Sequence, residues 1–469
     1  MSHSQDFLVG WDENDPANPR NFSLARRWLI VVLVSMGSLC VTCTSSIYTT
    51  TYAQITERFH ISQIVATLGL SFFIWGLGCG PLVLGPLSEF YGRRPIYILS
   101  LLFFLIWLIP CAVAQNVQTL IIGRFFSGLA GSAFLSVAGG TVGDLFARHE
   151  LAAPMMVYTA SPFIGPEICP LIGGFINEFT NWRWSFYVLM IWTGALLVAI
   201  IAFVPETYHP ILLKHKAATL RKETSDPRWK SPLDQSTQTV HTRILESIYR
   251  PILLLALEPM CLNLCIFSAI LLGILYLFFG AFQLIFSTVY DFTLWQRGCS
   301  FLGLLVDMVL AILTDPFWRW NYARLERNST EEKYPPEWRL PPAIAGAPLV
   351  TIGLFIFAWT IYPSAHWMGA IIGSAVFGAG TILVYSGILT FLVDAYPSYA
   401  ASAMAANSFA RSSFAGVFPL FGVQMYNRLG YHWATSLLAF LTLGMVPFPY
   451  LFFRYGGRIR KKSRFAGGN

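Results

Sequence analysis

The chain has few charged residues. Asp, Glu, Lys and Arg make up 12% of its 469 residues, whereas ordinary soluble proteins contain roughly 25%. A soluble globular fold of this size is excluded, because so little charge cannot cover its surface. The hydrophobic residues, 55% of the chain, occur in blocks such as 28–49 and 343–362. About 20 apolar residues are what a helix needs to cross a hydrocarbon core of roughly 30 Å, so the composition predicts a membrane protein.

Cysteine is also scarce, and the motifs of enzymes are missing. Of the eight cysteines, only Cys299 falls outside the apolar blocks, so we interpret the others as small packing residues and expect no disulfide framework. The sequence contains no glycine loop of the Walker type, no cluster of His and Cys ligands and no nucleophile motif. We therefore expect a protein that is not an enzyme and that holds no metal and no cofactor.

The alternation of apolar blocks and polar breaks predicts an all-α polytopic membrane protein with twelve transmembrane helices. We expect the helices near 28–50, 65–86, 95–115, 118–143, 152–177, 184–204, 258–288, 297–315, 343–363, 366–392, 399–425 and 431–453. This divides the chain into an N-terminal tail (1–27), a six-helix bundle (28–204), a central loop (205–257), a second six-helix bundle (258–453) and a C-terminal tail (454–469). Two halves with equal numbers of helices suggest an internal repeat.

The positive charges give this topology an orientation. Of the 31 Lys and Arg residues, the segments on one side of the membrane hold only Arg58, Arg183, Arg297 and Arg428, while Arg124 and Arg411 lie inside helices. The remaining ones fall in the two tails, the central loop and the other segments on the opposite side. Because cytoplasmic loops are enriched in Lys and Arg, we expect both termini in the cytoplasm. Charge sorted in this way argues against a nucleic-acid partner, in spite of the net charge of +7.

A glycine-containing loop joins the second and third predicted helices. Residues 85–95 read Gly-Pro-Leu-Ser-Glu-Phe-Tyr-Gly-Arg-Arg-Pro, in which Gly92 permits a tight turn. Glu89 and Arg93 stand four residues apart and are spaced for an ion pair. Asp315 and Arg319 have the same spacing after the eighth helix, which is a second trace of a repeat.

This loop resembles the signature loop of the major facilitator superfamily, and further motifs extend the resemblance over nearly the whole chain. The resemblance implies the major facilitator fold and an alternating-access secondary transporter. It also implies that Asp144 pairs with the arginines of the loop. Helix five carries a segment similar to the family's Gly-Pro antiporter motif, with Cys169 in place of a usual glycine. The residues to which the family pattern assigns conformational gating are Gly85, Glu89, Gly92, Arg93, Arg94, Asp144, Gly165, Pro166, Pro170, Gly173 and Gly174.

Three stretches, 205–217, 394–411 and 455–460, look like one branch of the superfamily, the fungal twelve-span drug:proton antiporters. That branch implies proton-coupled efflux of drugs, toxins or secondary metabolites. The alternative is a transporter of a defined organic acid or amine, in either direction. A nutrient-sensing receptor on the same fold stays open as well. Against a channel, the halves repeat around intramembrane charges and show no pore-lining signature.

Charges within a membrane are costly and are functional candidates by default. Glu167 in helix five is placed somewhat beyond mid-depth and Asp307 in helix eight near mid-depth, and in the family fold these helices are neighbours across the two halves. We therefore predict that one of the two carboxyl groups carries the coupled proton. Two neutral, hydrogen-bonded acids facing a wet cavity are the alternative. The family match also makes Arg124, in helix four, a candidate for proton coupling.

The cargo site is predicted less directly. Aromatic side chains with few polar groups suit hydrophobic or amphipathic molecules, although most aromatic residues in membrane helices pack or face lipid. Arg411 is equally well explained as a structural tie between helices. The candidates for substrate binding are Tyr276, Phe282, Gln283, Asn407 and Arg411. The expected partners are a small-molecule substrate, protons and membrane lipids, for a monomer in the plasma membrane.

Overall fold

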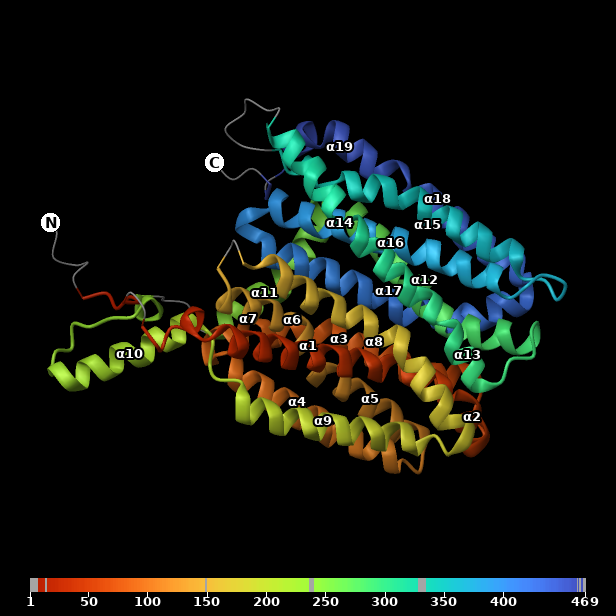
Figure 1. Ribbon diagram of the computed structural model, residues 1–469, viewed down its shortest axis with the longest axis horizontal. Helices are drawn as coiled ribbons and strands as arrows, with labels where there is room; N and C mark the ends of the chain where they lie inside the picture. Colours follow the sequence, from red (N-terminus) through yellow and green to blue (C-terminus); the bar gives the residue numbers. More distant parts are fainter. Residues whose placement is uncertain are drawn as a thin grey trace.

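The computed structural model is a bundle of long helices in two halves (Figure 1). It describes residues 7–12, 15–147, 150–235, 240–327, 335–461, 463 and 465–466. The helices of the first half are α1 (Leu24–Ile47), continued by the 3-10 turn Tyr48–Thr51 and α2 (Tyr52–Phe59), α3 (Gln63–Tyr91), α4 (Arg93–Val113), α5 (Val117–Gly131), α6 (Ala133–Ser136), α7 (Ala138–Leu145), α8 (Ala152–Phe179) and α9 (Arg183–Phe203).

The second half follows the same plan. Its helices are α12 (Pro259–Thr288), α13 (Leu294–Ser300), α14 (Leu302–Arg327), α15 (Pro341–Thr360), α16 (Met368–Ala395), α17 (Ala400–Leu429), α18 (Tyr431–Met445) and α19 (Pro447–Arg460).

Within the described residues, ten segments are long and apolar enough to cross a membrane. Helices α8 and α17 are as long as these but carry more polar residues and proline, and they bring the number of spans to twelve, as predicted. Both run along the contact between the halves. Helix α8 touches α13 and α14, and α17 touches α3, so polar groups on these faces are covered by protein and not by lipid.

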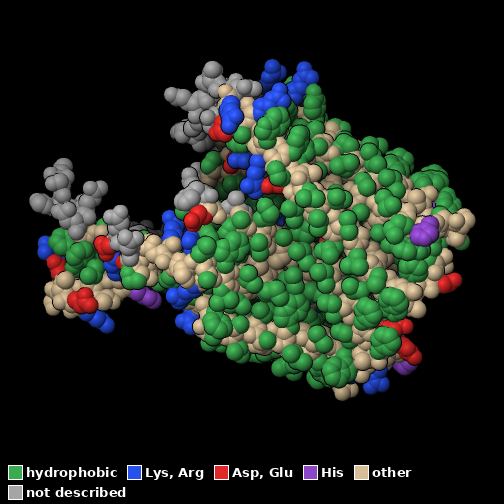
Figure 2. Space-filling model, viewed as in Figure 1, with side chains coloured by type: hydrophobic (Ala, Val, Ile, Leu, Met, Phe, Trp, Pro, Cys, Tyr) green, Lys and Arg blue, Asp and Glu red, His purple; other side chains and the backbone are tan. Residues whose placement is uncertain are grey.

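The two ends of the bundle differ in charge. One end carries both termini and the central segment with α10 (His209–Thr224) and α11 (Val240–Leu257) (Figure 1). On the visible face Lys and Arg gather mainly at this end (Figure 2), which we call the basic end. The opposite end, where α8 meets α13, we call the far end.

The central segment is more ordered than a polar loop. Helix α10 packs its Leu213 and Ala217 against Val9 in a small core of their own. The backbone of residues 7–9 runs beside Lys230 in a parallel bridge, with hydrogen bonds of 3.0 Å from Val9 N to Lys230 O and 2.9 Å from Lys230 N to Phe7 O. Helix α11 lies against α3 of the first half and α17 of the second.

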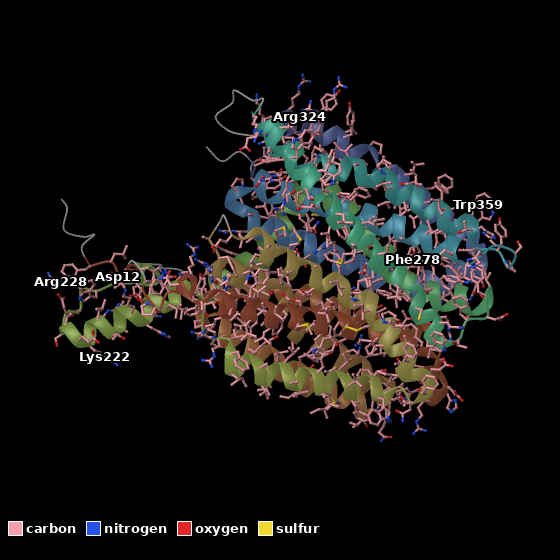
Figure 3. The ribbon with its side chains drawn as sticks, in the orientation of Figure 1. Asp12, Lys222, Arg228, Phe278, Arg324 and Trp359 are labelled. Atoms are coloured by element: carbon pink, nitrogen blue, oxygen red, sulfur yellow. A yellow bond between two sulfur atoms is a disulfide. The ribbon has the colours of Figure 1, made fainter. Side chains whose placement is uncertain are left out.

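The expectation that no disulfide forms is wrong. Cys43 of α1 and Cys169 of α8 are joined by a disulfide, with their Cα atoms 5.3 Å apart, and sulfur bonds of this kind are drawn in yellow in Figure 3. The pair is 126 residues apart in the sequence, so apolar surroundings alone could not reveal it. The two helices approach closely because Gly165 and Gly173, one turn to either side of Cys169, have no side chain between the backbones.

Candidate functional site

The signature loop at the basic end is held from the central segment. Gly92 separates α3 from α4 with a φ of +97°, and a β-carbon there would overlap the carboxylate of Glu206. Glu206 accepts hydrogen bonds from Arg93 N at 2.9 Å and from Arg94 N at 3.1 Å. A carboxylate at a helix N-terminus satisfies unpaired N–H groups and the helix dipole, so Glu206 anchors the start of α4. Sequence analysis missed this residue, although it lies in the branch motif 205–217.

The predicted ion pair between Glu89 and Arg93 is not formed. Helix α3 ends at Gly92, before Arg93, so Glu89 and Arg93 do not share a helix. Their spacing of four residues therefore does not place the two side chains on one helix face. Glu89 pairs instead with Arg243 of α11 at 2.7 Å. Asp315 and Arg319, which share α14, do pair at 2.6 Å.

Arg93 points back into the first half. Its Nε lies 3.3 Å from Asp144 Oδ2 of α7, the partner that the family pattern implies, and its Nη1 donates to Ser88 Oγ at 2.7 Å. The guanidinium also stands 4.6 Å from the centre of the Tyr208 ring. Arg93 therefore ties α3, α4, α7 and the central segment together at the basic end.

Two loop residues have simpler surroundings. Arg94 donates from Nη2 to Ile201 O of α9 at 2.9 Å. A β-carbon on Gly85 would meet no atom within 4 Å, so the glycine is not required there by packing.

The Gly-Pro segment of α8 contacts both halves. A β-carbon on Gly165 would overlap Thr42 of α1, and one on Gly173 would lie 2.6 Å from Thr50 Oγ1. On another face, a β-carbon on Gly174 would lie 2.9 Å from Leu294 O of α13. Pro166 and Pro170 lie within the helix, where they remove backbone donors. Gly298 of α13 in turn packs on Pro170, so the far end of the structure is closed by backbone-to-backbone contact.

Arg124 is a fully buried structural centre of the first half. It donates from Nη1 to Thr44 O of α1 at 2.7 Å and from Nε to Gly69 O of α3 at 3.2 Å. Its guanidinium lies 4.5 Å from the ring centre of Tyr48 and 4.2 Å from that of Phe73. Within the described residues its hydrogen bonds and ring contacts do not include Glu167 or Asp307, so in this conformation it links α1, α3 and α5 and stands apart from the two acids.

The two intramembrane acids lie on neighbouring helices. Glu167 of α8 is 4% exposed and Asp307 of α14 is 1% exposed, and α8 and α14 contact each other across the halves. Within the described residues, Glu167 Oε2 and both carboxyl oxygens of Asp307 have no hydrogen-bond partner. Buried polar groups are nearly always paired, so these three unpaired oxygens make Glu167 and Asp307 the candidates for a functional site.

The five cargo candidates are not brought to one place. Tyr276 hydroxyl lies 3.2 Å from Ser45 Oγ across the halves. Asn407 is held by Ser268 and Cys265 near the beginning of α12. Gln283 is near its end, and 18 residues of helix at 1.5 Å per residue put it roughly 27 Å beyond Cys265.

Two of the candidates have specific surroundings. Phe282 is buried in a packed aromatic cluster, stacked on Phe357 with ring centres 5.4 Å apart, and Phe278 of this cluster is labelled in Figure 3. Arg411 stands 5.3 Å from the ring centre of Tyr385, and its Nε has no partner among the described residues. Gln283 likewise has both amide atoms buried without a partner in that part of the chain.

Comparisons with known proteins agree with this architecture. The Major Facilitator Superfamily model matches residues 34–419. Efflux pump atB of Aspergillus terreus is 54% identical over 468 residues, which cover 98% of this chain and 90% of that protein. The probable drug/proton antiporter YHK8 of Saccharomyces cerevisiae is 43% identical, over 99% of this chain and 90% of that protein.

Solved structures show the same fold at low identity. A peptide transporter POT superposes with a TM-score of 0.66 at 13% identity, covering 96% of this chain and 98% of its own. The proton:xylose symporter XylE superposes with a TM-score of 0.64 at 16% identity, covering 92% and 97%. The chain belongs to the Major Facilitator Superfamily, in the branch of fungal efflux pumps and drug/proton antiporters, as its motifs predicted.

Proposed function

We propose that Glu167 and Asp307 are the proton-carrying site of this proton-coupled efflux transporter. The observation that carries the proposal is the pair of buried, interacting carboxyl groups on helices of opposite halves, with three oxygens that lack a partner among the described residues. Two ionised carboxylates in this place would repel each other and lack solvation, so a proton on one of them is strongly favoured. A proton taken up there changes the contact between the halves.

The orientation of the cycle follows from the charges. With the basic end in the cytoplasm, the α8–α13 contact closes the outer side, and cargo is loaded from the inner side when the basic end opens. Proton entry from outside then requires the far end to open, which couples proton influx to cargo export. We place both termini in the cytoplasm and the protein in the plasma membrane as a monomer.

The cargo class is an amphipathic metabolite or drug. Tyr276 contacts Ser45 of the other half, and Gln283 offers an amide without a partner among the described residues. Export of a defined organic acid is the second candidate, because Arg411 holds an unpaired Nε within the described residues. Substituting Arg411 by Gln should abolish export of an acidic cargo and leave that of a neutral or cationic cargo within about twofold.

The decisive experiment measures efflux of a panel of drugs and metabolites from cells that express wild type, Glu167→Gln, Asp307→Asn or the double variant, at external pH 5.5 and 7.5. Wild type should export panel members faster at the acidic pH. Loss of a proton site should reduce this pH-driven export at least tenfold, because a neutral amide cannot exchange a proton. Export that remains fully pH-driven in the double variant would overturn the proton-site proposal.

A further inference from the structure

Asp307 occupies a position that a single glycine makes possible. Its carboxyl group lies in the seam between α14 and α16, where a β-carbon on Gly378 would overlap the Asp307 oxygens. One turn earlier on α14, Gly303 lets α16 approach closely as well, since a β-carbon there would lie 3.4 Å from Ser374 Oγ and 3.2 Å from Ile371 O. We call Gly303, Asp307, Ser374 and Gly378 the α14–α16 seam.

We propose that Gly378 is a positioning residue that gives the protonated side chain of Asp307 a place inside this seam. The inference rests on the proposed role of Asp307 in proton coupling and adds the residue that controls it. Gly378 touches neither cargo nor proton. It acts through the room that it leaves for the carboxyl group.

The surroundings of Asp307 suit an uncharged acid and not a carboxylate. Neither oxygen has a hydrogen-bond donor within the described residues, and the side chain is 1% exposed. Transfer of an ionised carboxylate into such a place without a partner is far more costly than transfer of the neutral acid. The backbone of α16 at Gly378 offers only weak C–H contacts, which a neutral carboxyl group tolerates.

Loss of the proton therefore drives Asp307 out of the seam. The charged group that acts on Asp307 is Glu167 of α8. The residue of α16 that faces Asp307 is Gly378. An ionised Asp307 must either turn toward water or separate α14 from α16. In both cases the packing between two helices of the second half changes with the protonation of a single residue. Proton release is thereby converted into helix movement.

Removing the room at Gly378 should change proton binding in a definite direction. In Gly378→Ala the protonated side chain loses its place in the seam, while the ionised form, which lies elsewhere, is unaffected. Protonation of Asp307 then requires more acidic conditions. We expect its titration midpoint and the pH of half-maximal export to fall by about one unit, the scale set by modest differences in interaction energy.

The test uses protons as the only ligand. Infrared spectra of the purified full-length transporter in liposomes are recorded during a pH titration, and the carbonyl band of protonated Asp307 is identified by its absence in Asp307→Asn. Gly303→Ala is the matched control, because its added methyl group crowds the same seam without contacting Asp307. A midpoint that falls in Gly378→Ala and not in Gly303→Ala supports the inference.

Other outcomes separate the two proposals. If no titrating band is lost in Asp307→Asn, Asp307 is not a proton site and the positioning role of Gly378 fails, whereas the proposed proton site fails only if Glu167→Gln loses no titrating band either. If the band titrates but Gly378→Ala leaves its midpoint unchanged, only the positioning role of Gly378 is overturned. If Gly378→Ala fails to fold, the yield of folded protein is measured for the double variant Gly378→Ala, Asp307→Ala. Recovery of folded protein in the double variant supports the shared space, and failure of both overturns it.

Discussion

Among single residues, Gly92 has little freedom to be replaced. Its backbone, with φ +97° and ψ 169°, is in a region that residues with a side chain rarely adopt. The same position brings Glu206 within reach of the first N–H groups of α4. One glycine therefore permits both the turn and the contact that joins the signature loop to the central segment.

Gly92→Ala should lower the stability of the transporter by about 2 kcal/mol, because the strained backbone and the displaced Glu206 both destabilise the folded state. Thermal unfolding in detergent, followed by tryptophan fluorescence, should show a fall of several degrees. Gly85→Ala is the control and should change the unfolding temperature little, since its methyl group enters open space. Equal effects of the two substitutions would contradict this account of the loop.

Arg124 leads to a second prediction at this scale. Its Nη1 and Nε donate to carbonyl groups of two different helices, which the single ammonium of lysine cannot reproduce. Arg124→Lys should therefore cost about 2 kcal/mol of stability and reduce export at every pH in proportion to the folded protein that is lost. A selective loss of the pH dependence, with stability unchanged, would instead assign Arg124 to proton coupling. Circular-dichroism melting and the efflux assay together distinguish the outcomes.

At the level of elements, the N-terminal residues and α10 form a unit outside the bundle (Figure 1). Lys216 of α10 lies 2.6 Å from Asp12 Oδ2 and 2.7 Å from Asp15 Oδ2. Trp11 donates to His209 Nδ1 at 2.9 Å, and the other ring nitrogen of His209 lies 2.8 Å from Asp144 O. The N-terminal segment is thereby connected to the residue that pairs with Arg93.

Lys216→Ala should release the N-terminal segment from α10. Because exposed ion pairs contribute about 0.2–1 kcal/mol each, limited proteolysis within residues 7–12 and 15–20 should accelerate about two- to fivefold. Lys222→Ala is the control, since Lys222 lies on the same helix and forms no ion pair with another described residue. Lys222 is labelled with Asp12 in Figure 3. The same cleavage rate in both variants would show that Lys216 does not hold the segment.

This contact should be insensitive to physiological pH. The hydrogen bond to Lys216 lowers the pKa of Asp15 below its usual 3.8, so the stability that Asp15 contributes is present above that value and is lost only as pH falls through the lowered one. Hydrogen bonds to Asp12 and Asp15 raise the pKa of Lys216 above 10.5, so its contribution is present below 10.5 and is lost at higher pH. The acceleration of proteolysis by Lys216→Ala should therefore be the same at pH 5.5 and 8.5. An acceleration that differs markedly between the two pH values would contradict the assignment.

For the whole molecule, the halves must separate at the far end during each transport cycle. A β-carbon on Gly174 would lie 3.1 Å from Trp295 Cα, which is close enough for a disulfide between cysteines at the two positions. In Gly174→Cys with Trp295→Cys, mild oxidation should therefore reduce export at least tenfold, and a reducing agent should restore it. Each single variant treated in the same way is the control. Full export by the cross-linked double variant would mean that the far end does not open.

Helix positions could be predicted from the sequence because each depends on its own residues. An apolar block of sufficient length must satisfy its backbone hydrogen bonds internally in a membrane, and only a helix does so within one segment. The predicted range 118–143 accordingly falls within Val117–Leu145, and 366–392 overlaps Met368–Ala395. The signature loop, the Gly-Pro segment and the family were likewise readable, because their residues are consecutive in the chain.

The tertiary structure decided which residues contact each other. Glu89 meets Arg243 and not Arg93 because the helix ends between Glu89 and Arg93. Asp307 lies against Gly378 only because α14 and α16 pack closely there. The sequence by itself determined the helices, their charge asymmetry and the family, since these depend on local composition and order. The proximity of Glu167 and Asp307, the disulfide and the room beside Asp307 depend on how distant helices approach each other, which no single segment encodes.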